Sequence, residues 1–291
     1  MKRALVQLYK STIGYTERLF GSVPSERELI VACMHSTPED RLADFEKLVE
    51  RLKKRFTFLA PSDLPLYLEN PNHFKGGPYF LFTFDDGLSN NLGSAKILAA
   101  HKIKAIYFVV PDFIDAVDQE SYYRTYIRPV VDTRIDNQKD DVTSMSWSEI
   151  SALKEMGHTI GNHTKTHSLH QHMSQKEIET ELNYTDQKIQ EKIGVKPLFF
   201  ASPNNTLESV GSVATTVISK NQYYHFTTLP GLHSSGDNPK NWVYRRNIEV
   251  HWGKGAIEFA LGSFDLSRWQ KQRFALSLLL RASHHDTSSS L

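Results

Sequence analysis

Apolar runs alternate with amphipathic stretches along most of this chain. The runs typical of buried strands cover residues 28–34, 79–82, 105–110 and 198–201. Between them, apolar side chains recur every three or four positions, as in helices that bury one face, over residues 38–55, 91–101, 146–156 and 175–192. Strands without polar alternation, separated by helices, predict an α/β fold whose parallel sheet is covered on its outer face.

Weaker patterns complete this prediction. Shorter strands are expected at 56–59, 158–161, 223–228 and 248–250, and further helices at 63–68 and 207–221. The sequence shows neither an internal repeat nor a sharp linker. We therefore predict one domain over residues 28–270, an extension at 1–27 before it, and a tail at 271–291 whose polar end is expected to be disordered.

Residues 111–145 break the alternation and predict an insertion over one end of the domain. The segment is rich in tyrosine and arginine at first and polar afterwards. One interpretation is a solvated loop above a packed aromatic base, which we favour because aromatic clusters usually pack. The other is a wall or lid that stacks a sugar or contacts a membrane surface.

Charge and cysteine content narrow the range of functions. Of 291 residues, 34 are Lys or Arg and 33 are Asp or Glu, and a net charge of +1 gives no reason to expect a nucleic-acid partner. The single cysteine, Cys33, excludes an internal disulfide and a zinc site built from cysteines. We read no signal peptide or transmembrane run at the N-terminus, and we therefore expect a cytoplasmic protein that is either free or peripheral to a membrane.

Two adjacent carboxylates, Asp85 and Asp86, follow the apolar run at 79–82. Because neighbouring side chains on an extended strand point to opposite faces, the two carboxylates are expected to have different roles. His163 and His167 are four residues apart, a spacing that a tight loop or helical turn places on one face. Together with Asp86 they offer two nitrogens and one oxygen, which predicts a divalent metal, Zn²⁺ first, with Co²⁺, Ni²⁺ or Mn²⁺ also compatible.

These residues carry a family resemblance. Thr83-Phe84-Asp85-Asp86-Gly87 and His163-Thr164-Lys165-Thr166-His167 resemble the first two motifs of the polysaccharide deacetylases, carbohydrate esterase family four, which share the NodB-homology domain. Met145-Ser146-Trp147 is similar to the family's approach to its second motif. Ala32-Cys33-Met34-His35 is similar to the opening of one deacetylase branch.

The resemblance implies a single-domain, distorted (β/α)7 barrel with its site at the carboxyl ends of the strands. It also implies that Asp85 is the general base and that Asp86, His163 and His167 bind the metal. The implied reaction is hydrolysis of an N-linked, or alternatively O-linked, acetyl group of a sugar, with release of acetate. Because we expect a cytoplasmic location, a lipid- or nucleotide-linked glycan is a candidate substrate beside a polysaccharide.

The third motif departs from the common family pattern. Phe200-Ala201-Ser202-Pro203 resembles the branch that reads Phe-Ala-Tyr-Pro, and it lacks the arginine that helps to hold the base in many members. The segment that contains Arg245 and Arg246 is similar to that branch's arginine-containing segment near the last strand. From this resemblance we predict Arg246 as the substitute, although an ion pair at the surface is an equally ordinary role for either arginine.

A histidine is needed to protonate the leaving amine. The family usually supplies it from a late strand, and the resemblance therefore points to His251 at the end of the run 248–250. His233 and His35 are rivals for this role.

Two other functions are compatible with the same residues. One is hydrolysis of a formyl group or of a non-sugar amide, because the chemistry at the carbonyl does not depend on what lies beyond it. The other is a non-catalytic carbohydrate-binding module that kept the fold.

Overall fold

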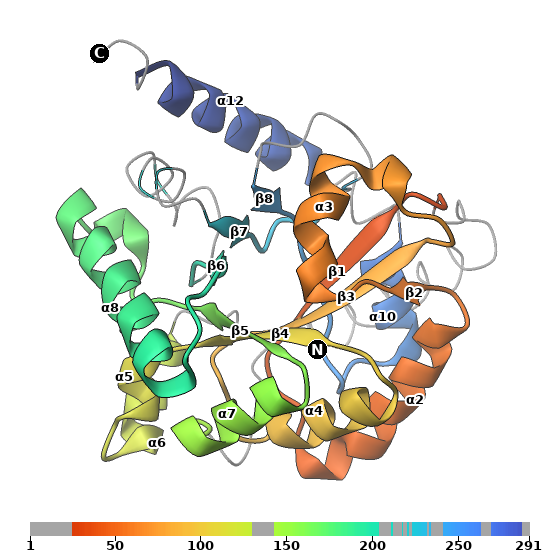
Figure 1. Cartoon of the computed structure of the whole chain (residues 1–291), viewed down its shortest axis with the longest axis horizontal. Helices are drawn as coiled ribbons and strands as arrows, with labels where there is room; N and C mark the ends of the chain where they lie inside the picture. Colours follow the sequence, from red (N-terminus) through yellow and green to blue (C-terminus); the bar gives the residue numbers. More distant parts are fainter. Residues whose placement is uncertain are drawn as a thin grey trace, which may run out of the picture.

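The predicted apolar runs form one parallel sheet in the computed structural model (Figure 1). The structure describes residues 25–129, 143–203, 223–231, 233, 241–262 and 269–286, and the single positions 211, 217 and 220. The strands are β1 (Leu29–Met34), β2 (Thr57–Phe58), β3 (Tyr79–Phe84), β4 (Ala105–Val109), β5 (Thr159–Asn162), β6 (Phe199–Ala201), β7 (Tyr224–Phe226), β8 (Trp242–Val243) and β9 (Arg246–Asn247).

Helices connect the strands, and most of them cover the outer side of the sheet, whereas the helix Leu64–Glu69 packs against its inner face. They are α2 (Leu42–Lys53), α3 (Leu64–Glu69), α4 (Asn91–Ala100), α5 (Pro111–Ile114), α6 (Gln119–Tyr122), α7 (Trp147–Glu155), α8 (Gln175–Ile193), α10 (Lys254–Leu261) and α12 (Gln270–Asp286). Short 3-10 turns lie at Glu39–Arg41, Pro61–Asp63, Pro71–His73 and His170–His172, and a π-helical turn, η4, lies at Tyr123–Ile127. None of the helices in the described residues is long and apolar enough to span a bilayer.

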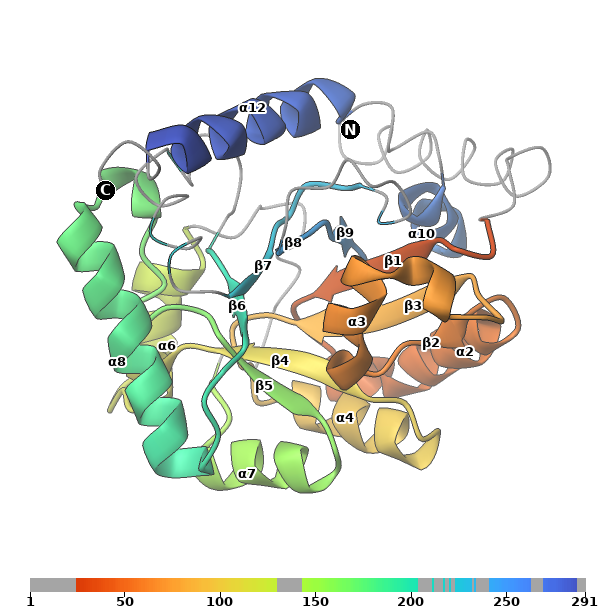
Figure 2. The same cartoon turned by 45° about the horizontal axis from the view of Figure 1, so that its top comes forward.

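The sheet curls into a parallel half-barrel in the order β8-β7-β6-β5-β4-β3-β1-β9, with β2 beside the first half of β3 (Figure 2). Every pair in this order is parallel. Its first and last members, β8 and β9, are consecutive in sequence and are separated by Tyr244 and Arg245 alone. Residues 242–247 therefore join the two ends of the sheet. The α/β, single-domain fold predicted above is confirmed.

Alternate residues of the central strands enter two different cores, which explains the unbroken apolar runs. Phe80, Phe82 and Phe84 of β3 pack outward against the helices. Tyr79 and Leu81 point to the inner cluster, which contains residues of β1, β4, β6, β7 and β8. By this alternation, Thr83 and Asp85 continue the inner face of β3.

The helix boundaries follow local chemistry. Ser146 and Ser174 begin α7 and α8 as capping boxes with Glu149 and Glu177. Gly194 ends α8 in the left-handed conformation, with a φ of 74°.

Several sequence predictions need correction. The expected strand at 248–250 is not formed, because the chain pairs with β1 only over β9 and then turns at Val250 and His251. Part of the predicted tail is helical, since α12 continues to Asp286. Most of the helix predicted at 207–221 and the polar half of the insertion, 130–142, lie outside the described residues.

Candidate metal centre and catalytic residues

The polar residues singled out in the sequence come together at the carboxyl ends of three strands. Asp85 and Asp86 follow β3, His163 follows β5, and His35 follows β1. Because parallel strands all end on the same side of a sheet, residues far apart in sequence meet there.

Asp86, His163 and His167 form a buried cluster. The Oδ1 atom of Asp86 lies 3.3 Å from Nε2 of His163 and 3.1 Å from Nε2 of His167. All three side chains are at most 3% exposed. This Oδ1 atom makes no hydrogen bond to any described residue, although it is buried. An unsatisfied carboxylate oxygen that faces two imidazole nitrogens is the arrangement that a metal ion resolves.

Outer hydrogen bonds fix both imidazoles in the form that binds metal. His163 donates from Nδ1 to the carbonyl of Ala201 at 2.7 Å, and His167 donates from Nδ1 to the carbonyl of Tyr126 at 3.3 Å. Since a carbonyl can only accept, each Nδ1 carries the proton and each Nε2 presents a lone pair toward Asp86. The donor set of this chain therefore fits a divalent metal. Burial alone would raise the pKa of Asp86, but the hydrogen bonds and charge of the imidazoles in their protonated, metal-free form outweigh burial and hold this pKa well below its usual value.

The ligand loops have unusual backbone conformations. Asp86, Thr164 and His167 have φ angles of 69°, 66° and 64°, in the left-handed region that costs a non-glycine residue about 1–2 kcal/mol. Local hydrogen bonds offset this cost: Asn162 Oδ1 accepts from the Thr164 amide at 2.8 Å, and Thr164 Oγ1 accepts from the His167 amide at 3.0 Å. Helix α8 adds a clamp, because Glu181 accepts from the Thr166 amide at 2.8 Å.

Asp85 pairs with Arg245. The guanidinium donates from NH1 to Oδ1 at 2.6 Å and from NH2 to Oδ2 at 2.8 Å, and it also donates to Thr83 Oγ1 and to the carbonyl of Thr227. The arginine is fully buried and Asp85 is 3% exposed. Burial would raise the pKa of Asp85, but the charge of Arg245, supported by His163, outweighs it and lowers the pKa.

The structure places Arg245, and not Arg246, beside Asp85. Arg246 points away and donates to the carbonyl of Leu261 at 2.5 Å and to Glu28 at 3.1 Å. The placement expected for Arg246 is thus corrected. The physical reason is that the two neighbouring side chains point to opposite sides: Arg245, which lies between β8 and β9, faces Asp85, whereas Arg246, the first residue of β9, faces away from it.

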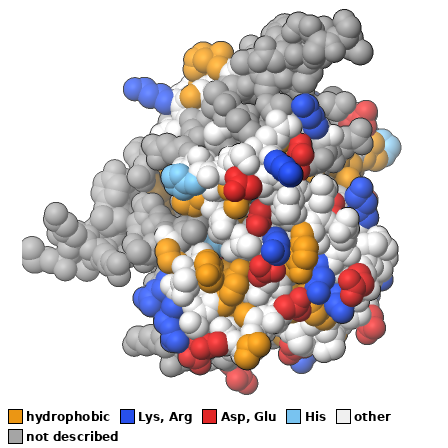
Figure 3. Space-filling model, turned by 90° about the vertical axis from the view of Figure 1, so that its left-hand side faces the viewer, with side chains coloured by type: hydrophobic (Ala, Val, Ile, Leu, Met, Phe, Trp, Pro, Cys, Tyr) orange, Lys and Arg blue, Asp and Glu red, His pale blue; other side chains and the backbone are white. Residues whose placement is uncertain are grey.

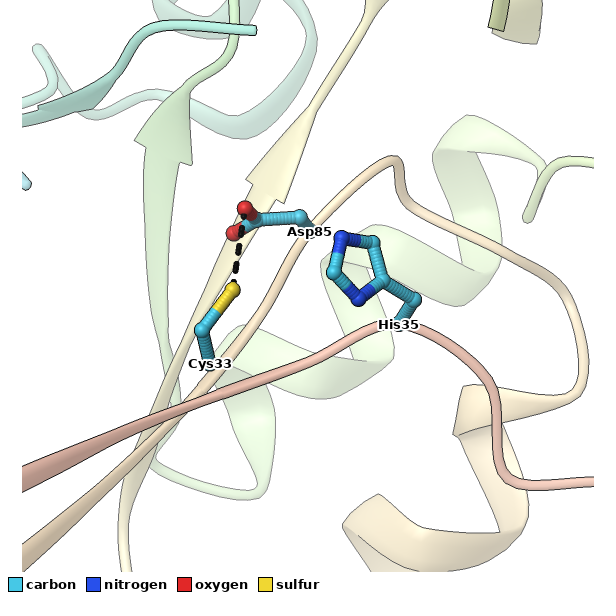
Figure 4. A group of neighbouring side chains, drawn as sticks. All are labelled: Cys33, His35 and Asp85. Atoms are coloured by element: carbon cyan, nitrogen blue, oxygen red, sulfur yellow. Dashed lines mark hydrogen bonds between the residues drawn. The ribbon is translucent and has the colours of Figure 1, made fainter. Parts of the chain in front are cut away.

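A second group of possible metal donors consists of Cys33, His35 and Asp85 (Figure 4). The thiol of Cys33 donates to Asp85 Oδ2 at 3.4 Å. This group is poorly suited to a metal. The negative charge of Asp85 is already balanced by the positive charge of Arg245. Burial raises the pKa of the Cys33 thiol well above its usual value, so the thiolate that would bind a metal does not form readily.

His35 has a strong carboxylate partner. Its Nδ1 lies 2.8 Å from Oε1 of Glu249, which is 1% exposed. Burial disfavours the imidazolium, but the hydrogen bond and charge of Glu249, with the carboxylates of Asp86 and Asp85 behind it, outweigh burial and raise the pKa of His35 to about 9. A histidine close to Asp85 is therefore protonated at neutral pH.

The other two candidate acids lie elsewhere. His251 is half-buried in the turn after β9, and burial together with the nearby charge of Arg41 lowers its pKa. No hydrogen bond or ion pair joins it to Asp85 in the described part of the chain, so the placement expected for His251 is corrected because the predicted strand does not continue to it. His233 lies 2.9 Å from the carbonyl of Leu29 and accepts from the amide of Tyr244 at 3.0 Å. Its role in the structure is to join loops.

Sequence reasoning missed Glu249 as a functional residue. The sequence signal was a carboxylate in an apolar run, two residues before His251, and we interpreted that run as a strand. The partner, His35, lies 214 residues away, and the pairing of β9 with β1 brings the two together.

Comparisons with known proteins agree with the observed fold. Residues 75–222, just over half of the chain, match the family model described as polysaccharide deacetylase. The fold resembles that of the deacetylase PplD from Streptococcus pyogenes, solved with acetate, with a TM-score of 0.62 and 15% identity over 79% of this chain and 96% of that chain. It also resembles IcaB from Ammonifex degensii, with a TM-score of 0.60 and 19% identity over 80% of this chain and 97% of that chain. No curated protein sequence matches this one.

The first test concerns the metal. We expect Asp86→Asn and His163→Ala to weaken Zn²⁺ binding by more than the loss of an outer hydrogen-bond partner does, which is about 10- to 100-fold. Titration calorimetry and elemental analysis measure this, with the exposed His172→Ala as control. Chelation should lower the unfolding temperature of the original protein, because a bound ion stabilises the folded state. It should not lower that of Asp86→Asn, which has no bound ion to lose. Equal metal affinity in all four proteins would contradict the assignment.

Proposed function

This chain belongs to the polysaccharide deacetylase family of carbon–nitrogen hydrolases, and from that premise we propose that it removes an N-linked acetyl group from a sugar. The observation that carries the proposal is that two adjacent carboxylates have different surroundings. Asp86 faces two imidazoles, whereas Asp85 faces a guanidinium and a thiol. Only a reaction that needs both a metal ligand and a separate ionised base makes use of this difference.

We propose Zn²⁺ as the metal, because two imidazoles and one carboxylate with open positions are a common catalytic zinc set. A metal held there supplies Lewis acidity toward the acetyl carbonyl and the attacking water. Co²⁺, Ni²⁺ and Mn²⁺ compete for the same donors.

Asp85 is the proposed general base. Arg245 and Cys33 occupy one lone pair of Oδ1 and both lone pairs of Oδ2, which leaves one lone pair of Oδ1 to accept the proton of the attacking water. The guanidinium keeps the carboxylate ionised in a buried site, and its bidentate geometry fixes the direction of the free lone pair.

His35 is the proposed general acid. The water oxygen bonds to the carbonyl carbon, and one proton passes to Asp85. When the carbon–nitrogen bond breaks, His35 donates a proton to the leaving nitrogen, and the products are acetate and a free amine. Glu249 keeps His35 charged for this step, and its carboxylate stabilises the imidazole orientation. This role replaces the one expected for His251.

The second test concerns turnover. We expect the purified protein to release acetate from an N-acetylated glycan, and Asp85→Asn to lower the rate by about 10²- to 10⁴-fold, the usual contribution of a general base, while the metal stays bound. The exposed Asp40→Asn is the matched control. Acetate assays and elemental analysis on the same samples decide the outcome. Loss of metal in Asp85→Asn together with its retention in His163→Ala would overturn the assignment.

The third test concerns pH. Because the acid must carry its proton, activity should fall as the pH rises through the pKa of His35, which is about 9. Glu249→Gln removes the charge that raises this pKa, so the alkaline limb of the kcat profile should move to lower pH. Glu258→Gln, a buried carboxylate that pairs with Arg55, serves as control and should leave the limb in place. An alkaline limb that does not move in Glu249→Gln would exclude His35 as the acid.

A further inference from the structure

The π-helical turn η4 lies directly against the metal-binding loop. The carbonyl of Tyr126 accepts the hydrogen bond from His167 at 3.3 Å, and the hydroxyl of Tyr122 donates to the carbonyl of Thr166 at 3.2 Å. Such wide helical turns are rare and occur frequently at functional sites. The aromatic half of the insertion therefore packs against the loop that carries the metal donors.

Three aromatic rings form a ladder from the core to the surface. Phe113 is fully buried and stacks on Tyr122, with centroids 5.7 Å apart and an interplanar angle of 16°. Tyr122 contacts Tyr126, with centroids 4.7 Å apart. The outermost ring, Tyr126, is 49% exposed. The ladder thus presents a large, supported aromatic ring to solvent next to a metal ligand.

Packing explains the inner part of the insertion but not Tyr126. Tyr123 and Ile127 are buried and form a small core with Leu88, Val110 and Phe113. Tyr126 is outside that cluster, and its main-chain carbonyl alone would serve His167 equally well with a small side chain. Neither the core nor the hydrogen bond to His167 uses this ring, so it is available for contact with a ligand.

The surrounding charges favour an uncharged polar ligand over an anionic membrane. Basic side chains in this region are balanced by acidic partners. Lys165 pairs with Asp112, and Arg124 pairs with Glu120. Acidic and basic side chains are interspersed over the face of the molecule that includes α8 (Figure 3). A membrane-binding face would instead show a basic stripe.

We propose that Tyr126 is a sugar-binding subsite, and that its ring stacks on a pyranose adjacent to the acetylated residue. One face of a pyranose is lined with C–H groups, which pack well on an aromatic ring, while its hydroxyls remain in water. The inference rests on the proposed function and deepens it, because it assigns the substrate to glycans of at least two residues.

The fourth test measures binding without turnover. Full-length Asp85→Asn protein loaded with Zn²⁺ is titrated with N-acetylglucosamine and with its tetramer. We expect Tyr126→Ala to raise the dissociation constant of the tetramer about five- to tenfold, the usual worth of one aromatic stack, and to leave that of the monomer unchanged. Tyr126→Phe should restore the tetramer affinity, because it keeps the ring. Zn²⁺ affinity should not change, because the carbonyl of residue 126 remains.

Tyr184→Ala is the matched control, since this tyrosine of α8 is also exposed, at 36%, and has no contact with His167 among the described residues. Equal tetramer affinity in Tyr126→Ala and its parent would overturn the subsite, as would failure of both to bind the tetramer. An equal loss for monomer and tetramer would also overturn it, because Tyr126 would then act on the metal loop.

The outcome separates this inference from the proposed hydrolysis. If the native protein releases no acetate but Tyr126→Ala still weakens tetramer binding, the subsite stands and the proposed reaction falls. If acetate is released and Tyr126→Ala changes neither the dissociation constant nor the KM of the tetramer, the subsite alone falls.

Discussion

The buried ion pair between Asp85 and Arg245 is the interaction on which the site depends. Two opposite charges that are both removed from water are tolerated only when their geometry is good and their remaining hydrogen bonds are met. Here the pair is bidentate, and Thr83 and the carbonyl of Thr227 each accept one further guanidinium proton. The pair also bridges the fold, because Arg245 lies between the two ends of the sheet and Asp85 follows its central strand.

The ion pair gives two neighbouring aspartates different surroundings, although their side chains are chemically identical. Arg245 keeps Asp85 ionised and away from the metal donors. Asp86, in the left-handed conformation, turns to the opposite side and meets His163 and His167. The strained residue Asp86 lies between two residues whose backbones are hydrogen-bonded, because the amide of Asp85 donates to the carbonyl of Met34 and the carbonyl of Gly87 accepts from the amide of Met145. One short segment therefore supplies both the proposed base and the proposed metal ligand.

Much of this could be predicted from the sequence. Unbroken apolar runs separated by amphipathic helices are enough to predict a covered parallel sheet, and carboxylates at the end of such a run predict a site at its edge. The first two motifs identified Asp85, Asp86, His163 and His167, which the structure brings together in one place. These patterns are local, so they can be recognised in the sequence without knowledge of the fold.

The partners of these residues could not be predicted, because they depend on pairing between strands that are far apart in sequence. Arg245 and Arg246 are adjacent, and a break between β8 and β9 leaves no alternation from which to decide which one faces inward. His35 was visible as a histidine at a strand tip, but its partner Glu249 follows β9, which pairs with β1 although it lies far away in sequence. His251 was preferred because a strand was expected to lead to it, and the chain turns there instead.

The most direct measurement compares Arg245→Gln with Arg246→Gln in acetate release and Zn²⁺ affinity, at a temperature where both remain folded. The account predicts that Arg245→Gln loses about 100-fold or more in kcat with its metal still bound, because the base loses its partner, while Arg246→Gln loses stability and keeps kcat. The reverse result, a large loss of kcat in Arg246→Gln and none in Arg245→Gln, would contradict it.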